Sequence, residues 1–319
     1  MNLPLLNVWK MNNLNYEKVF ETLVRETKDY LHSNSLHAMV LGISGGIDST
    51  VVAAICREVS DETGIPFIGR SLPIKNKNDE FSVSKLVGNA FCDDFKVVHL
   101  SYMCQHVIQA IYDGEGTLGT PISKGNIQAR LRMIYLYNLA GINRGLVMDT
   151  DNLTEHNLGF WTIHGDEGDF NPIGGLWKTE VYELAKYILR KYEDKMRSLD
   201  EGHFYEEEDR LGAMYKAIAE SIALTPTDGL GISNSDLEQI GAKSYKEVDD
   251  ILQDYFAFLE ISPTIEEGMT PKQMVDSYVE HNAFYDIPNE VIEKVLTRHI
   301  NSEFKRKHRP IVIPRNCYA

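Results

Sequence analysis

The sequence predicts an α/β protein built on a doubly wound parallel sheet flanked by helices, with extra helices toward the C-terminus. Apolar runs that suit strands alternate with segments of helical spacing from residue 38 to residue 148. Strands of a parallel sheet that is covered on both faces form continuous apolar runs of this kind. Ligands of such a sheet bind beyond the carboxyl ends of its strands, so the functional residues are expected there.

Four segments are expected to form the strands. The first, residues 38–43, is a continuous apolar run, and a glycine-rich loop follows it directly. The other predicted strands are 66–69, 95–100 and 144–148, and the helices between the strands are 50–57, 79–91, 101–112 and 126–141. Residues 14–35 place apolar side chains on one helical face, which predicts an amphipathic helix before the first strand.

The chain is expected to form a single catalytic domain over residues 1–319. Its core is predicted at about 38–260, and a long helical stretch is predicted after residue 179, running to about 199. A helical insertion at about 190–222 contains the acidic stretch 200–210, which we interpret as a solvated break between helices. Residues 261–319 are expected to form C-terminal helices and an extended, proline-marked tail.

The composition limits the expected partners and location. With 319 residues, 43% of them hydrophobic, the chain can bury a sizeable core. The net charge of -15 repels polyanions, so no nucleic-acid partner is expected. The four cysteines lie far apart without a Cys-x-x-Cys pair, which argues against a zinc site or a disulfide framework and favours the cytoplasm. No apolar run reaches the length of a membrane span, so no membrane partner is expected either.

The loop after the first strand is the strongest functional signal. Its glycines let backbone N–H groups approach an anion, its serines add hydroxyl donors, and its aspartate can hold the Mg²⁺ that accompanies ATP. The alternative is a tight turn without a ligand, which two serines and an aspartate after a buried strand make less favourable. The spacing matches neither a Walker loop nor a Gly-x-Gly-x-x-Gly fingerprint. The predicted phosphate-binding residues are Gly42, Ile43, Ser44, Gly45, Gly46, Ile47, Asp48 and Ser49.

The segment Ser-Gly-Gly-Ile-Asp-Ser resembles the pyrophosphate-binding loop of the N-type ATP pyrophosphatases. These enzymes have a Rossmann-like fold and cleave ATP to AMP and pyrophosphate. Other segments resemble the ammonia-dependent NAD synthetases within that group, and the resemblance covers residues from about 38 to 310. The matching segments are Lys-Gly-Asn-Ile-Gln-Ala-Arg-Leu-Arg-Met at 124–133, Thr-Asp-Asn-Leu-Thr-Glu at 150–155, Gly-Asp-Glu-Gly-Asp-Phe-Asn-Pro at 165–172, Leu-Trp-Lys-Thr at 176–179, Pro-Thr at 226–227 and Phe-Lys-Arg at 304–306.

The resemblance implies a role for individual residues. It adds Thr150, Lys178 and Thr227 to the ATP site, and it implies that Asp48 and Glu155 hold the Mg²⁺ ion. It implies that Lys178 and Asp166 are catalytic, with Lys178 meeting the ATP phosphates and Asp166 lying near the attacking ammonia. The residues that it implies for deamido-NAD binding are Arg130, Asp169 and Lys305.

The implied reaction has two steps. The nicotinate carboxylate of deamido-NAD attacks the α-phosphorus of ATP, and ammonia then attacks the acyl adenylate, which gives NAD, AMP and pyrophosphate. Ammonia is the expected nitrogen donor because the 40 residues before the first strand cannot encode an amidase domain; a separate glutaminase subunit stays open. The resemblance also implies a homodimer; Tyr135, Leu136, Tyr137 and Leu139 are candidates for its apolar face, with an ordinary place in the core as the alternative.

Two other functions stay open at this point. The chain could be another N-type ATP pyrophosphatase, such as a tRNA-modifying or GMP-forming enzyme, or a nucleotide-binding regulatory protein without turnover. Three positions also depart from the family pattern, and the loop from residue 165 is one residue shorter. Ile163 stands where lysine is frequent, Asp149 where glycine is frequent, and Phe304 where histidine is frequent.

Overall fold

The computed structural model describes residues 14–74, 78–199, 205–224, 236–261, 269–281 and 286–307. Four parallel strands form one sheet in the order β3-β2-β1-β4. The strands are β1 (Met39–Gly42), β2 (Phe67–Ser71), β3 (Asp94–Val97) and β4 (Leu146–Val147). β1 lies between β2 and β4, so the strand order reverses between β1 and β4, and their carboxyl ends form the switch point where ligands of such sheets bind. The predicted doubly wound parallel fold is confirmed.

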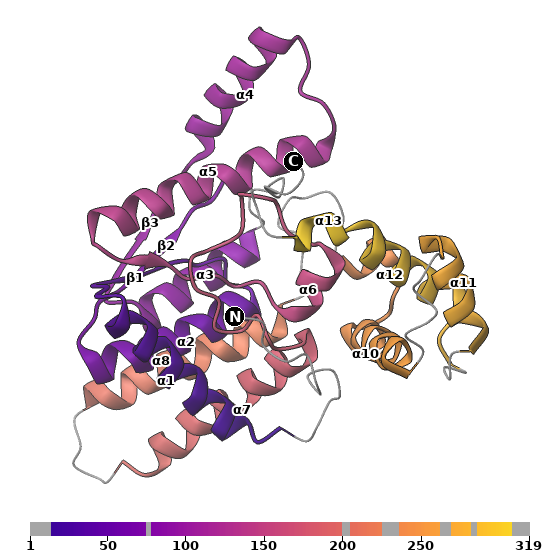
Figure 1. The fold of residues 1–319 in the computed structure, drawn as a ribbon. Coiled ribbons are helices and arrows are strands. Elements are labelled where there is room, and N and C mark those ends of the chain that lie inside the picture. The colour runs from indigo at the N-terminus through magenta and orange to yellow at the C-terminus, as the bar shows by residue number, and fades with distance from the viewer. Residues whose placement is uncertain are drawn as a thin grey trace, which may run out of the picture.

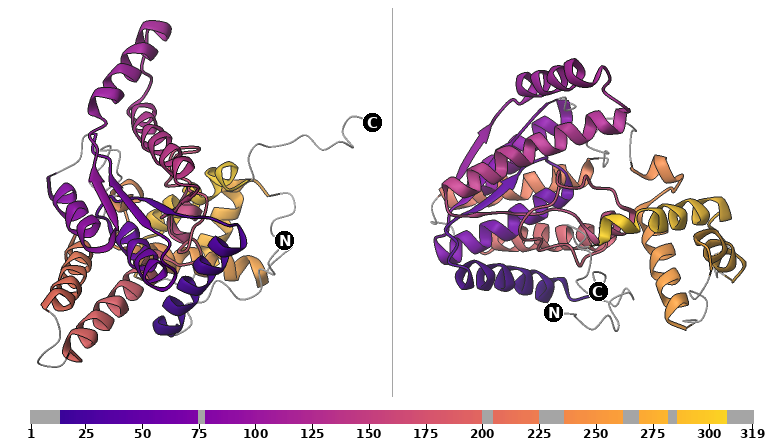
Figure 2. Two further views of the ribbon diagram at one scale, coloured as in Figure 1. Left: turned by 90° about the vertical axis from the view of Figure 1, so that its left-hand side faces the viewer. Right: turned by 45° about the horizontal axis from the view of Figure 1, so that its top comes forward.

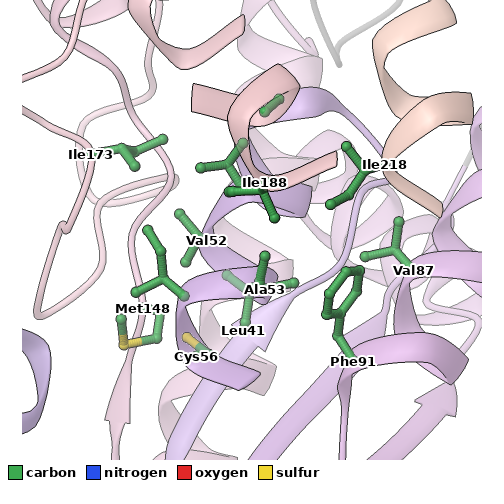
Figure 3. Close-up of a cluster of buried hydrophobic side chains, with 14 of the residues drawn as sticks. Leu41, Val52, Ala53, Cys56, Val87, Phe91, Met148, Ile173, Ile188 and Ile218 are labelled. Carbon is green, nitrogen blue, oxygen red and sulfur yellow. The ribbon is translucent and has the colours of Figure 1, made fainter. Parts of the chain in front are cut away.

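One face of the sheet is covered by helices that precede the first strand, lie between strands and follow the last strand (Figure 1). Met39 and Leu41 of β1 point toward this face, where they join the largest hydrophobic cluster. Figure 3 shows Leu41 packed among Val52 and Ala53 of α2 and aliphatic side chains of α7 and α8. The helices on this face are α1 (Tyr16–Ser33), α2 (Ile47–Thr63), α3 (Asn78–Phe91), α7 (Lys178–Arg197) and α8 (Tyr205–Ala223).

The opposite face is covered by α5 (Pro121–Ile142), with α4 (Ser101–Glu115) projecting beside it (Figures 1 and 2). Val40 of β1 points toward this side, and Leu136 of α5 is buried against the same cluster. Leu136 therefore belongs to the core, which is the alternative that the sequence left open for it. The exposed apolar side chains of α5 are Ile122, Ile134, Tyr137 and Ile142, so Tyr137 is the one candidate among them.

The remaining helices form a second hydrophobic cluster beside the sheet (Figure 1). Trp177 is fully buried in this cluster and precedes α7 directly, so the cluster is joined to a helix of the main core. The helices that contribute are α6 (Leu153–Leu158), α9 (Asp236–Ile240), α10 (Tyr245–Ile261), α11 (Pro271–His281) and α12 (Asn289–Asn301), and α13 (Glu303–Arg306) follows.

Several predicted boundaries shift, and each shift has a local cause. The helix expected from residue 50 begins at Ile47, so Asp48 and Ser49 lie in its first turn. The strand expected at 144–148 is reduced to Leu146–Val147. At its start Arg144 takes a positive φ of 51° in the turn after α5, and at its end Met148 forms an isolated bridge to Phe170. The acidic stretch is no break from residue 205 onward: Glu206 to Glu208 form the first turn of α8, where the helix dipole favours negative charge.

Candidate active site

The loop between β1 and α2 presents N–H groups and hydroxyls at the carboxyl edge of the sheet. Gly45 has a φ of 90°, a conformation open to glycine, and Gly46 is the N-cap of α2 without a capping side chain. The first-turn N–H groups of α2 are therefore available to an anion. The hydroxyls of Ser44 and Ser49 lie 2.9 Å apart, and Ser49 also donates to the carbonyl of Gly46 at 3.1 Å. This arrangement is able to bind an anion, and the assignment of the loop to phosphate stays a prediction.

A buried lysine joins the two carboxylates that the sequence predicts as metal ligands. The ammonium of Lys178, at the start of α7, donates to Asp48 Oδ2 and, at 3.0 Å, to Glu155 Oε1. Burial alone would lower the pKa of Lys178, but the two facing carboxylates outweigh it and raise this pKa well above its ordinary value. The side chain is therefore a fixed positive charge between Asp48 and Glu155.

Asn152 orients both carboxylates, although sequence reasoning did not assign it a role. Its side chain caps α6 by accepting from the N–H of Glu155 at 3.0 Å, and its Nδ2 donates to Asp48 Oδ1 at 2.9 Å. Glu155 completes a capping box by accepting from the N–H of Asn152. The spacing Asn-x-x-Glu is the signal that could have found this cap.

A hydrogen-bonded network from α10 fixes the start of α7. The fully buried Asp249 accepts from the Thr154 hydroxyl at 2.5 Å and from the N–H and hydroxyl of Thr179 at 3.0 and 2.7 Å. The Thr154 oxygen in turn accepts from the N–H of Lys178 at 2.9 Å. Burial raises the pKa of Asp249 to about 6 in spite of these three donors. Sequence reasoning missed Asp249, because its partners lie 95 and 70 residues away.

A cavity of about 910 Å³ opens beside this cluster. Asp151, the residue before Asn152, lines it, so the cavity and the phosphate loop share one edge of the sheet. Its lining combines acidic, basic and aromatic side chains. The residues are Arg130, Met133, Ile134, Tyr137, Asp149, Asp151, His156, Trp161, His164, Glu167, Gly168, Asn171, Gly174, Lys305, Arg306 and Lys307.

Two of the predicted dinucleotide-binding residues lie in the cavity wall. Arg130 is exposed and donates to the carbonyl of Ile163 at 3.3 and 3.2 Å. Lys305 donates to the carbonyls of Gly159, at 2.6 Å, and Trp161. Burial, followed by the charge of Arg298, lowers the pKa of Lys305. Both cations are thus held by backbone carbonyls at the surface of the cavity.

The segment 165–170 carries the other two predicted acids, and neither is part of the cavity lining. Asp166 Oδ2 accepts from the N–H of Thr162 at 2.7 Å. Its side chain faces solvent, yet protein surrounds the carboxyl on most sides, and this desolvation raises its pKa. Asp169 Oδ2 accepts from the N–H of Val147 at 2.9 Å, so it is bound to β4 rather than directed into the cavity. Contact of Asp169 with deamido-NAD would require this bond to break, and it stays a prediction.

The remaining predicted residues are placed as follows. Thr150 is half-buried in the loop directly after β4, near the phosphate-binding edge. Thr227 lies outside the described residues. Sequence reasoning gave Asp151 no role. Its pKa is raised well above the ordinary value, first by burial and then by the charges of Asp149 and Glu155.

The parallel sheet, the serine–glycine loop at its switch point and the adjoining cavity define a nucleotide-binding α/β protein with room for a second ligand beside the phosphates. Within this class the chain belongs to the NAD synthase family, whose model matches residues 19–309. It is 32% identical over 220 residues to an NH(3)-dependent NAD(+) synthetase of Campylobacter jejuni subsp. doylei, covering 67% of this chain and 86% of that one. An NH(3)-dependent NAD(+) synthetase of Archaeoglobus fulgidus is 29% identical over 224 residues, covering 66% and 85% of the two chains.

Solved structures share the fold of this chain. An NMN synthetase from Francisella tularensis superposes with a TM-score of 0.69 at 22% identity, covering 95% of this chain and 99% of that chain. An NH3-dependent NAD synthetase from Campylobacter jejuni gives a TM-score of 0.60 at 22% identity, covering 94% and 100%. None of the helices in the described ranges combines the length and the apolar character needed to cross a membrane.

Proposed function

We propose that this chain is an ammonia-dependent NAD synthetase, which uses ATP to amidate deamido-NAD. The observation that carries the proposal is the Lys178–Asp48–Glu155 cluster between the phosphate loop and the cavity. One side of this cluster can hold ATP phosphates. The other side offers a cavity with basic and aromatic side chains, which suit the phosphates and rings of a dinucleotide.

In the first step the chain aligns a carboxylate with the α-phosphorus of ATP. The N–H groups of the loop and of the first turn of α2 donate to pyrophosphate and stabilise the negative charge that develops on it. The ammonium of Lys178 lies next to this loop through its bond to Asp48, so its positive charge acts on the same phosphates. The nicotinate carboxylate attacks, pyrophosphate leaves with the bonding electron pair, and an acyl adenylate forms.

The carboxylates of Asp48 and Glu155 fit a magnesium ion by their chemistry. Both are hard oxygen donors gathered around one positive charge, the Lys178 ammonium. Within the described ranges no group of three or more His, Cys, Asp or Glu side chains converges to hold a metal. Asp48 and Glu155 are thus the residues that would hold the ion, together with oxygen atoms of phosphate and water. When bound, magnesium offsets phosphate charge and polarises the phosphoryl group.

In the second step ammonia displaces AMP from the adenylate. Ammonium is the main form near neutrality and must lose a proton before its nitrogen can attack. Asp166 is proposed to take this proton, because the family resemblance implies a place near the ammonia and desolvation raises the pKa of its carboxyl above the ordinary value. The amide nitrogen loses its remaining extra proton as AMP leaves.

The enzyme is proposed to act as a cytoplasmic homodimer that takes free ammonia. The described cysteines Cys56, Cys92 and Cys104 are free thiols, which suits a reducing compartment. Support for the dimer comes from exposed apolar side chains on α4 and α5, among them Tyr102 and Ile134.

The test is an assay of the purified chain with ATP, Mg²⁺, deamido-NAD and ammonium. NAD, AMP and pyrophosphate are expected in equal amounts. A parallel arm replaces deamido-NAD by deamido-NMN, because one solved structure of similar fold is described as an NMN synthetase. Turnover of deamido-NMN alone would contradict the dinucleotide substrate, and ATP binding without AMP formation in either arm would favour a regulatory protein. Saturable activity with glutamine in place of ammonium would contradict the ammonia assignment.

A further inference from the structure

The segment 168–170 lies flush against the end of β4. The N–H of Asp169 donates to the carbonyl of Val147 at 2.8 Å, and the N–H of Asp149 donates to the carbonyl of Phe170 at 2.9 Å. A Cβ atom at Gly168 would lie 2.8 Å from the backbone nitrogen of Asp149 and from the carbonyl oxygen of Val147. Only glycine therefore permits this approach.

The carboxylate of Asp149 fastens this segment from the strand side. One oxygen accepts from the N–H of Gly168 at 2.9 Å, and the other accepts from the N–H of Asp151 at 2.8 Å. The residue is only 8% exposed. A glycine, the frequent residue of the resembling family at this position, would provide neither acceptor. Asp149 thus links the segment 165–170 to the loop that leads toward Glu155.

The fastened segment forms part of the cavity wall. Asp149, Glu167 and Gly168 all line the cavity, and the hydroxyl of Tyr137 on α5 donates to the carbonyl of Glu167 at 3.0 Å. A mobile segment would have to be ordered when the substrate binds, at a cost in conformational entropy. The two backbone N–H groups also partly offset the negative charge of Asp149. The carboxylate therefore repels phosphates in the cavity less strongly.

We propose that Asp149 is a positioning residue that holds the segment 165–170 against β4 before the substrate binds and so raises the affinity of the cavity for its anionic ligand. This inference rests on the proposed placement of deamido-NAD in the cavity. The hydrogen bonds from Gly168 and Asp151 to Asp149, called the Asp149 clasp, are present in the protein without substrate. The clasp and its effect on ligand affinity are therefore measured separately.

The test uses Asp149→Asn and Asp149→Ala. An asparagine has one acceptor oxygen and so loses one of the two backbone bonds, whereas alanine loses both. Hydrogen exchange of the protein without substrate is expected to become faster at the amides of both Gly168 and Asp151 in Asp149→Ala, and at one of these two amides in Asp149→Asn. The KM for deamido-NAD is expected to rise about tenfold in Asp149→Ala and less in Asp149→Asn, while the KM for ATP stays within about twofold.

Asp93→Asn is the matched control. Asp93 also binds a backbone N–H, that of Phe67 at 2.8 Å, but at the amino end of β2. This variant is expected to lower the melting temperature without a change in either KM. Unchanged amide exchange in Asp149→Asn would overturn the clasp. Faster exchange with an unchanged KM for deamido-NAD would overturn its link to affinity. If the wild-type chain fails to turn over deamido-NAD, the proposed function fails, and the exchange measurement still decides on the clasp.

Discussion

Lys178 is the residue at which the phosphate loop, α6 and α7 meet. Its ammonium is buried between Asp48 and Glu155, so it offsets one of their two negative charges and stays close to the phosphate loop. Replacing it by methionine keeps the apolar stem and removes the charge. We expect Lys178→Met to lower kcat/KM by about 10²-fold or more, the range seen when a transition-state charge loses one stabilising group.

The control for this substitution lies on the same helix. Lys186 pairs with Glu183 at 2.6 Å in the solvent, where an ion pair contributes little, so Lys186→Met is expected to keep wild-type kinetics. Steady-state assays of AMP release compare the two variants, with circular dichroism as the check of folding. A folded Lys178→Met variant with wild-type kcat/KM would remove Lys178 from the mechanism.

Asp166 allows the two chemical steps to be separated. In Asp166→Asn the carboxylate that would accept a proton from ammonium is gone, while the phosphate loop is untouched. We expect adenylate formation to persist and the amidation step to slow by about 10²-fold. Quenched-flow measurement of pyrophosphate and NAD would show a pyrophosphate burst without matching NAD. Raising the pH should partly restore the variant, because it supplies ammonia already deprotonated; equal slowing of both steps at every pH would contradict the role.

At the scale of elements, the sequence predicted those features that local pattern controls. The apolar run of β1 and the serine–glycine loop lie next to each other in the chain, so both could be placed from sequence. The acidic start of α8 is helical and not the predicted break, because the helix dipole favours negative charge in the first turn. The bonds from Asp149 to Gly168 and from Asp249 to Thr179 join positions 19 and 70 residues apart, which periodicity does not reveal.

Asp249 ties α10 to α6 and α7, and its titration predicts how this junction responds to pH. Its pKa is raised from 3.8 to about 6, with burial as the first cause. An acid whose pKa is raised in the folded state stabilises the fold at a pH below its pKa in the unfolded chain. This contribution is lost as the pH rises through its pKa in the folded protein. The shift corresponds to about 3 kcal/mol, so wild-type stability is expected to fall by an amount of this order between pH 4 and pH 6 on account of Asp249.

Asp249→Asn removes this titration. The free energy of unfolding of the variant, measured with urea, should therefore improve relative to wild type as the pH rises from 4 to 6. The lost acceptor gives a separate cost that does not depend on pH. A difference between the two proteins that is constant over this interval would contradict the raised pKa. Because the same carboxylate holds the start of α7, the variant should also show lower kcat at neutral pH.

At the scale of the whole molecule, α4 and α5 leave apolar side chains exposed on the side of the sheet away from α1 and α7 (Figure 2). Ile134 is 63% exposed, and both Ile134 and Tyr137 also line the cavity. A second copy packed on this face would cover these side chains and close the cavity from outside. A substitution that weakens dimerisation through this face should therefore also weaken the binding of deamido-NAD.

Ile134→Glu places a charge in the middle of this face. We expect the mass from light scattering to fall from that of a dimer to that of a monomer, and the KM for deamido-NAD to rise at least about tenfold, with the KM for ATP nearly unchanged. Met269→Glu is the control, because Met269 is an exposed apolar residue outside α4 and α5. A monomeric Ile134→Glu variant with an unchanged KM for deamido-NAD would separate assembly from substrate binding, since the cavity of one protomer would then suffice for the dinucleotide.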